Sequence, residues 1–389
     1  MGRIQKNVVI LGWVSFLTDV SSDMILPVLP LFLANVLGTG KAFIGLIEGV
    51  AESTSSCLRV GSGWYSDRLG RRKPLAFTGY AVSHVTKPLL ALATSWSHVL
   101  AVRFADRVGK GIRTAPRDAL IAEASLHGTR GLSFGFHRMM DTAGAVVGAS
   151  IAFLLLSLMP EAYRTLFALS AIPGFLAVVV FLLFVKERKV RDDERLMEGG
   201  SWAENRHRVG GNLRLFLVCI SLFAFSTVSY AFLILRANEL GVAGRFIPLV
   251  YLLYNIVFAL FAFPCGSLSD RIGRVPVLGI GMFLHGMVLL GFAAARHAVQ
   301  AWILFAVYGV AVAITDTVPR AFVADLVATE QRGTALGLYH TAVGVIPLPA
   351  NLLFGLVWSR STSELVFALW ALLAWAALFL FVLIRRRLQ

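Results

Sequence analysis

The sequence has 389 residues, of which 57% are apolar and only 15% are charged, and its mean hydropathy is +0.74. Soluble domains carry about 25% charged residues, so this composition excludes a water-soluble globule. The net charge of +14 does not indicate a nucleic-acid partner, because the basic residues lie between long apolar runs and do not cluster on soluble structure.

The apolar runs predict twelve transmembrane helices, since a helix needs about 20 apolar residues to cross a bilayer. In the first half of the chain, we predict helices over residues 7–36, 42–65, 74–94, 97–121, 131–157 and 162–185. In the second half, we predict them over residues 212–235, 246–268, 275–294, 299–326, 333–358 and 364–384. The predicted fold class is an all-α membrane protein, with an N-terminal six-helix bundle (1–185), a cytoplasmic linker (186–211) and a C-terminal six-helix bundle (212–389).

The basic residues at the predicted helix ends indicate the orientation. Most of them fall on the side of the two tails and the long linker, and six fall on the other side: Lys41, Arg164, Arg236, Arg245, Arg296 and Arg360. Basic residues close to a span are retained in the cytoplasm. We therefore predict a multi-pass protein of the plasma (inner) membrane with both termini in the cytoplasm.

The two halves repeat one motif after the second predicted helix of each. The first copy contains Gly63, Asp67, Arg68, Gly70 and Arg71, and the second copy contains the matching residues Gly266, Asp270, Arg271, Gly273 and Arg274. Such a repeat predicts two parallel halves related by an axis along the membrane normal.

Residues 63–73 resemble the loop signature of the Major Facilitator Superfamily, with every fixed position matched. The resemblance implies a carrier of the twelve-helix fold, with a cytoplasmic latch at this motif and at its degenerate second copy. An alternative is that the basic residues only enforce topology. That alternative accounts for Arg71 but not for Asp67 and the two glycines.

The fourth predicted helix carries Arg103, Arg107 and Lys110 on one face, within the thickness of the bilayer. Such charges are costly in lipid, so they should face a wet cavity or a carboxylate. The segment from Arg107 to Gly111 resembles the family's helix 4 signature, and the resemblance implies that Arg107 takes part in proton coupling. The alternative is an ion-pair network with Asp106 and with helix 2 carboxylates that only holds the half together.

Four carboxylates within predicted spans are candidates for carrying the coupled proton: Asp19, Glu48, Glu52 and Asp141. A carboxylate inside the membrane can load and release a proton as its surroundings change between dry and wet. Glu48 has the alternative of being merely solvated near the outer third of its helix. Beside these acids, Arg59, His137 and Arg138 join Arg103 and Lys110 as candidates for a charged cavity wall.

The second half is nearly free of buried charge. It offers polar and aromatic residues for the other cavity wall, namely Tyr230, Tyr254, Asn255, Tyr339 and His340. A cavity that is charged on one wall and aromatic on the other suits an amphiphilic or anionic organic solute. Each aromatic taken alone is also explained by packing or by anchoring at the membrane interface.

The sequence thus predicts a secondary transporter of a small organic solute that works by alternating access and is coupled to protons. Efflux is slightly favoured, because the loop and helix 4 signatures resemble those of drug:proton antiporters. Import of an anionic metabolite and a sensor that binds a solute without moving it are the alternatives. We expect no enzyme activity, cofactor or metal, since neither a P-loop nor metal-ligand spacing is present, and we expect a monomer.

Overall fold

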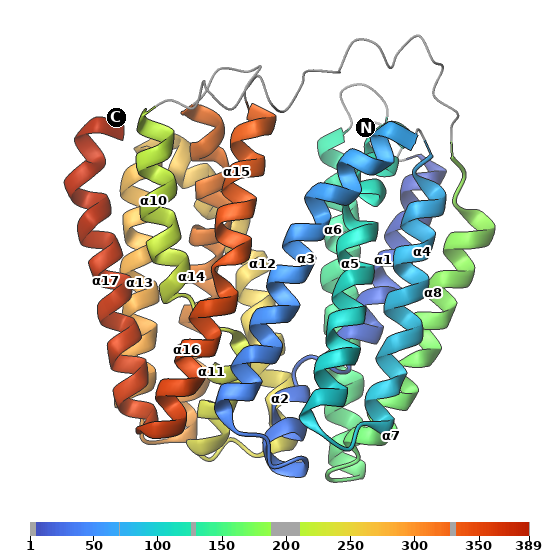
Figure 1. The fold of residues 1–389 in the computed structure, drawn as a ribbon, viewed down its shortest axis with the longest axis horizontal. Coiled ribbons are helices and arrows are strands. Elements are labelled where there is room, and N and C mark those ends of the chain that lie inside the picture. Colours follow the sequence, from blue (N-terminus) through green and yellow to red (C-terminus); the bar gives the residue numbers. More distant parts are fainter. Residues whose placement is uncertain (1–4, 70, 126–129, 188–210, 327–331, 389) are drawn as a thin grey trace. The chain divides into compact units, whose positions relative to one another are not determined.

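The structure is a computed structural model that describes residues 5–69, 71–125, 130–187, 211–326 and 332–388. Every regular element in these ranges is a helix, which confirms the all-α class (Figure 1). The chain forms two compact units. Unit 1 comprises Met1–Thr39, Val50–Met197 and Gly244–Leu252, and unit 2 comprises Gly40–Gly49, Glu198–Ala243 and Leu253–Gln389.

The first half of the chain supplies ten helical segments, some of which follow one another directly. They are α1 (Lys6–Asp23), α2 (Leu29–Leu31), η1 (Phe32–Val36), α3 (Lys41–Leu69), α4 (Lys73–Thr86), η2 (Lys87–Leu92), α5 (Trp96–Ala124), α6 (Arg130–Leu158), α7 (Tyr163–Leu169) and α8 (Ala171–Phe184).

The second half supplies nine described segments. They are α10 (Gly211–Ser226), α11 (Tyr230–Glu239), η5 (Gly244–Phe246), α12 (Ile247–Ile272), α13 (Arg274–Ala294), α14 (Ala298–Asp325), α15 (Arg332–Val345), α16 (Pro347–Arg360) and α17 (Ser363–Leu388).

Several helices that we predicted as continuous are broken, and proline explains three of the breaks. The helix predicted over residues 7–36 ends at Asp23, ahead of Pro27, and resumes at Leu29. The one predicted over residues 74–94 tightens into a 3₁₀ segment at Lys87, next to Pro88. Pro347 starts a new helix after α15. A proline lacks the N–H that an α-helix needs in its interior, so each break is a local backbone effect.

Eight helical stretches among the described residues are long and apolar enough to cross a membrane. They are Phe136–Leu158, Tyr163–Phe184, Gly211–Glu239, Gly244–Ser269, Arg274–Ala294, Ala298–Val323, Leu338–Arg360 and Ser363–Arg385. The first four predicted spans are helical as well, but they are interrupted by charged residues or by a break. For these four, crossing of the membrane stays a prediction.

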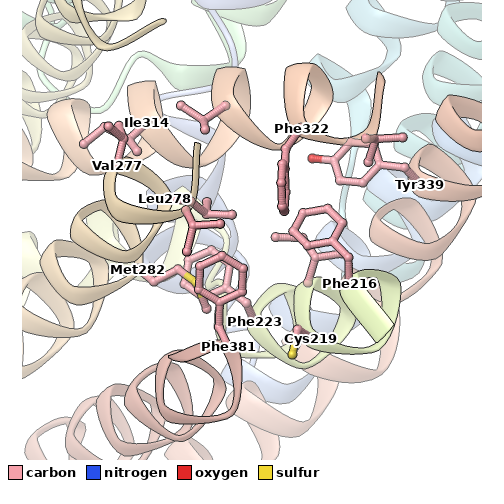
Figure 2. Packing of buried hydrophobic residues seen from close by; sticks show 14 of the residues in the cluster. Phe216, Cys219, Phe223, Val277, Leu278, Met282, Ile314, Phe322, Tyr339 and Phe381 are labelled. Carbon is pink, nitrogen blue, oxygen red and sulfur yellow. The ribbon is translucent and has the colours of Figure 1, made fainter. Parts of the chain in front are cut away.

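An aromatic and aliphatic core holds the helices of unit 2 together (Figure 2). The ring of Phe216 on α10 packs edge-on against Phe322 of α14, with centroids 4.8 Å apart, and it also contacts Phe381 of α17. Leu278 and Met282 of α13 complete the contact and are buried. Burying each such side chain stabilises the packed state by roughly 1.5–3 kcal/mol relative to exposure to water. In a bilayer, where lipid and not water surrounds the helices, van der Waals contacts between tightly packed helices stabilise the fold instead.

Candidate functional site

Two glycines of α6 allow close packing against α1, and this packing places the acidic residues of α1. A Cβ atom built on Gly148 would lie 2.6 Å from the carbonyl oxygen of Val20 and 3.1 Å from the Cβ of Asp23. A Cβ on Gly144 would lie 3.1 Å from the Cβ of Asp19. Small residues four apart let helices approach closely in membranes. The small residues Gly144 and Gly148 of α6 therefore form a contact surface for α1, which carries Asp19.

Replacing Gly148 by Ala should lower the free energy of unfolding by about 1–3 kcal/mol, because the added methyl group meets backbone that cannot rotate away. Denaturant unfolding in detergent micelles measures this loss. Gly61→Ala on α3 is the matched control, since its Cβ would enter open space. That substitution should raise stability by about 0.5–1 kcal/mol through helix propensity. Equal effects at the two positions would contradict the packing argument.

Asp141 on α6 joins the same region. Ser15 of α1 donates a hydrogen bond to Asp141 Oδ1, and His137 Nδ1 lies 3.5 Å from Oδ2 one turn away on α6. Asp19 is within electrostatic range of Asp141 and of Asp23. The structure thus brings together two of the four predicted proton carriers, Asp19 and Asp141, in unit 1.

Two basic residues of α5 lie in electrostatic range of Asp19. Lys110 is in electrostatic range of Asp19 and of Glu52, and Arg113 is in range of Asp19. The guanidinium of Arg113 also lies 4.6 Å from the centre of the Tyr80 ring, an arrangement that favours a buried cation. Asp19 of α1 therefore shares its surroundings with two bases of α5.

A second glycine contact joins α4 to α5. A Cβ on Gly79 would lie 2.6 Å from the carbonyl oxygen of Gly109, and a Cβ on Gly109 would lie 2.7 Å from the backbone nitrogen of Ser83. The close approach lets the Ser83 hydroxyl donate to Asp106 Oδ1 over 2.5 Å. On the neighbouring α1, Thr18 Oγ1 lies 3.2 Å from His84 Nε2.

Asp106 is the centre of a buried ion cluster on α5. Its Oδ2 lies 3.7 Å from Arg103 Nη1 and 3.4 Å from Arg107 Nε. Lys87, at the start of η2, donates a hydrogen bond of 2.7 Å to Ser22 and lies in electrostatic range of Asp106. A pocket within unit 1 is lined by these four charged side chains. The structure thus contains the Asp106 part of the ion-pair network that we raised as the alternative for Arg107.

Glu48 belongs to unit 2. It is buried and accepts a hydrogen bond of 3.3 Å from the hydroxyl of Ser229, whose backbone N–H donates to Asn351 Oδ1 over 2.9 Å. Ser229 also caps the start of α11. The first turns of α3, which carry Glu48, thus belong with α11 and α16, while Glu52 and Arg59 belong to unit 1.

The aromatic candidates of the second half have different surroundings. Tyr339 is buried in the core of unit 2 beside Phe322 and Phe216 (Figure 2). Its ring is therefore part of the packed interior rather than of an open wall. Tyr254 is half-buried, and its ring is tilted against that of Tyr308, with the centroids 5.2 Å apart. The remaining candidates are half-buried as well, namely Tyr230, Asn255 and His340.

Part of the repeated loop motif lies in the described residues. Gly70 lies outside them, as do the side chains of Asp67, Arg68 and Asp270. A Cβ built on Gly63 would lie 3.3 Å from the Cβ of Ala115 on α5. Gly273 adopts a φ of +95°, a backbone conformation that favours glycine. Arg71 and Arg271 are exposed.

Ion pairs follow the motif in each unit. The Arg72 guanidinium pairs with Glu123 of α5, and the backbone N–H groups of Arg72 and Lys73 both donate to Glu187. In unit 2, Arg274 pairs with Asp325 of α14 at 2.9 Å. An arginine near the end of each motif thus forms an ion pair with an acid at the end of the fourth helix of its own half, α5 or α14.

A model of the Major Facilitator Superfamily matches residues 11–214 and 214–389. The chain belongs to this superfamily. Its members are transporters, so the chain is a multi-pass membrane transporter of some solute and not an enzyme. The family assignment that the loop motif suggested is confirmed.

Relatives and solved structures agree with this assignment. An uncharacterized MFS-type transporter of Methanocaldococcus jannaschii is 39% identical over 378 residues, which cover 96% of this chain and 93% of that protein. An uncharacterized protein of Mycobacterium tuberculosis is 29% identical and covers 97% of this chain and 93% of its own length. The crystal structure of the nucleoside transporter NupG has a TM-score of 0.80 at 15% identity, over 97% of this chain and 98% of that one. This last likeness shows the fold alone.

Sequence reasoning missed several residues of the transporter's buried cluster. Lys87 could have been recognised from the sequence, since it is a lysine inside the apolar run of the third predicted helix. Ser83 and His84, one turn before it, had no signal of their own. Arg138, which we predicted at the cavity wall, and Glu52, which we predicted as a proton carrier, are exposed in the structure. His137, also predicted at the cavity wall, is buried.

Proposed function

We propose that this transporter is a proton-coupled secondary carrier of a small organic solute, and that Asp19 and Asp141 carry the coupled proton. The single observation behind the proposal is the meeting of these two carboxylates of α1 and α6 in unit 1, with Lys110 and Arg113 in range of Asp19. Ionisable residues in membrane-spanning segments are costly, and they mark proton relays and substrate pathways.

The chemistry of the pair suits a proton that is alternately bound and released. Two ionised carboxylates repel each other, whereas a nearby cation favours the ionised form of an acid, and Lys110 and Arg113 are both in range of Asp19. Ser15 and His137 orient Asp141. A change of wetting around these groups during the transport cycle shifts the balance between the two forms. Arg107 acts through Asp106, with which it pairs, and through the charge that it adds to this region.

The transport direction that we favour is efflux, with the solute exchanged for protons across the plasma membrane and both termini in the cytoplasm. Import of an anionic metabolite is the second candidate, because three buried cations line one pocket of unit 1. A solute screen by thermal shift on the purified protein, followed by flux in proteoliposomes with and without a pH gradient, tests the proposal. Binding without flux under any gradient would favour a sensor instead.

The loop motif acts in this proposal as a cytoplasmic latch. Replacing Asp67 by Asn should abolish solute flux while leaving the amount of folded protein in the membrane unchanged, because the proposed latch depends on the negative charge of this carboxylate. Flux in proteoliposomes and elution from a size-exclusion column measure the two properties. Asp316→Asn is the matched control, since Asp316 forms a surface pair with Arg320 on α14. Flux that persists in Asp67→Asn would rule out the latch.

A further inference from the structure

The segment that joins the two halves of the chain starts in contact with the ends of three helices of unit 1. The chain leaves α8 through Val185, which is buried in an apolar cluster with residues of α1, α4 and α5. Leu11 of α1 and Ala76 of α4 belong to this cluster, and both lie within two turns of the start of their helix. The end of α8 therefore meets the starts of α1 and α4, and Lys186 and Glu187 follow directly.

Asn7, at the start of α1, binds the backbone of Lys186 by two hydrogen bonds. The Lys186 N–H donates to Asn7 Oδ1 over 3.0 Å, and Asn7 Nδ2 donates to the carbonyl oxygen of Lys186 over 2.9 Å. A side-chain amide has both a donor and an acceptor, so it satisfies both backbone groups of one residue. The first residue after Val185 is thus held in place by α1.

The residues at the start of α4 cannot cap this helix themselves. The helix begins at Lys73, the last residue of the loop motif, and Arg72 is its N-cap. Arginine and lysine side chains are donors only, and positive charge is unfavourable at a helix N-terminus. The missing acceptor is Glu187 Oε1, which accepts from the N–H of Arg72 and, over 3.1 Å, from the N–H of Lys73.

The position of this carboxylate controls the end of the loop motif. Arg72, Lys73 and Glu187 are half-buried, so water only partly replaces the hydrogen bonds between them. A second contact acts in the same direction, because Lys73 Nζ donates to the carbonyl oxygen of Leu182 on α8 over 2.9 Å. The loop motif is thus bound at its end to residues that are 109 to 115 positions later in the chain.

We infer that Asn7 and Glu187 are positioning residues of the loop motif. Asn7 fixes Lys186, and the neighbouring Glu187 then caps α4 and fixes the end of the motif. The inference rests on the proposed function, since it assigns two further residues to the latch. Without them, the start of α4 opens more often, the latch forms less often and the transport cycle slows.

Hydrogen exchange of the full-length protein in detergent, followed by mass spectrometry, tests the contacts themselves. In a peptide that contains Arg72 and Lys73, Glu187→Ala should lower the protection of these two N–H groups by about 10- to 100-fold, the effect of removing a hydrogen bond to a charged acceptor. Glu187→Gln keeps an acceptor oxygen and should lose less protection. Glu161→Ala is the control, since Glu161 is exposed in the turn between α6 and α7.

Asn7→Ala separates the two contacts. It removes both partners of the Lys186 backbone, so the N–H of Lys186 should exchange faster than in the wild type. Glu187 keeps its own hydrogen bonds to α4 in this variant. The protection at the start of α4 should therefore fall by less than in Glu187→Ala.

Transport separates a positioning role from one that only stabilises the fold. Exchange of labelled for unlabelled solute in proteoliposomes should have a lower maximal rate in Glu187→Ala, with the half-saturating solute concentration unchanged. The rate is divided by the amount of folded protein recovered from a size-exclusion column, so a mere loss of folded protein does not lower it. Glu187→Gln should recover most of the rate, and Glu161→Ala should keep all of it.

The inference is overturned if Arg72 and Lys73 exchange equally fast in the wild type and in Glu187→Ala. It is equally overturned if their protection is lost while the maximal rate per folded protein stays at the wild-type value. Failure of the proposed proton coupling gives a different pattern, in which the exchange of labelled solute responds to Glu187→Ala as expected while a pH gradient drives no accumulation.

Discussion

Asp19→Asn should abolish the accumulation of solute that a pH gradient drives, while exchange of labelled for unlabelled solute continues. The amide has nearly the shape of the carboxylate, but it can neither bind nor release the coupled proton. Because the Asp19 carboxylate is the proposed proton site, its loss removes that site. Lys110 and Arg113 lose a counter-charge at the same time. Proteoliposomes loaded with solute, assayed with and without a pH gradient, separate the two activities.

Asp141→Asn is the informative partner of this variant. The side-chain oxygen of Asn can still accept the hydrogen bond from Ser15, so the contact between α1 and α6 survives. If the two carboxylates act together, pH-driven accumulation falls here too. Asp316→Asn controls for the loss of a charge at an exposed position. If Asp19→Asn accumulates solute under a pH gradient as well as the wild type does, a different residue carries the coupled proton.

Arg236→Met should lower the free energy of unfolding by about 2–5 kcal/mol, the largest loss of stability that we expect from replacing one buried charged residue. Arg236 is buried, and its guanidinium donates to the carbonyl oxygens of Phe292 and Ala295 and to the hydroxyl of Ser363. Methionine fills similar volume but leaves these acceptors without a donor. Denaturant unfolding in detergent measures the change.

The matched control for this loss is Arg320→Met. Arg320 is half exposed and pairs with Asp316 one turn away, and exposed pairs contribute about 0–1 kcal/mol. A loss at Arg236 no larger than the loss at Arg320 would show that the three acceptors are satisfied by other groups once the arginine is removed.

The sequence predicted the fold class well because the membrane imposes it. Long apolar runs have to form helices in lipid. The repeated motif around Asp67 and Asp270 is typical of the family. Helix ends were less predictable. The breaks after Asp23 and at Lys87 follow from prolines, but a proline inside a membrane helix also occurs without a break, as Pro116 in α5 and Pro264 in α12 illustrate.

The candidate site was only partly predictable, because helix periodicity tells which residues share a face and not which helix faces them. The three bases of α5 were predicted on one face, yet only the packing at Gly79 and Gly109 brings Ser83 to Asp106. Glu48 and Glu52 share a face of α3 but belong to different units. Arg236 was predicted only as a basic residue at a helix end, whereas its side chain is buried among carbonyl oxygens.

Proton movement driven by the solute tests the central claim most directly. Proteoliposomes that contain a pH-sensitive dye are given a solute gradient and no initial pH gradient, with the membrane potential held at zero by potassium and valinomycin. The proposal predicts that the solute gradient changes the internal pH in wild-type vesicles and leaves it constant in Asp19→Asn vesicles. Solute flux with no change of internal pH in the wild type would contradict it.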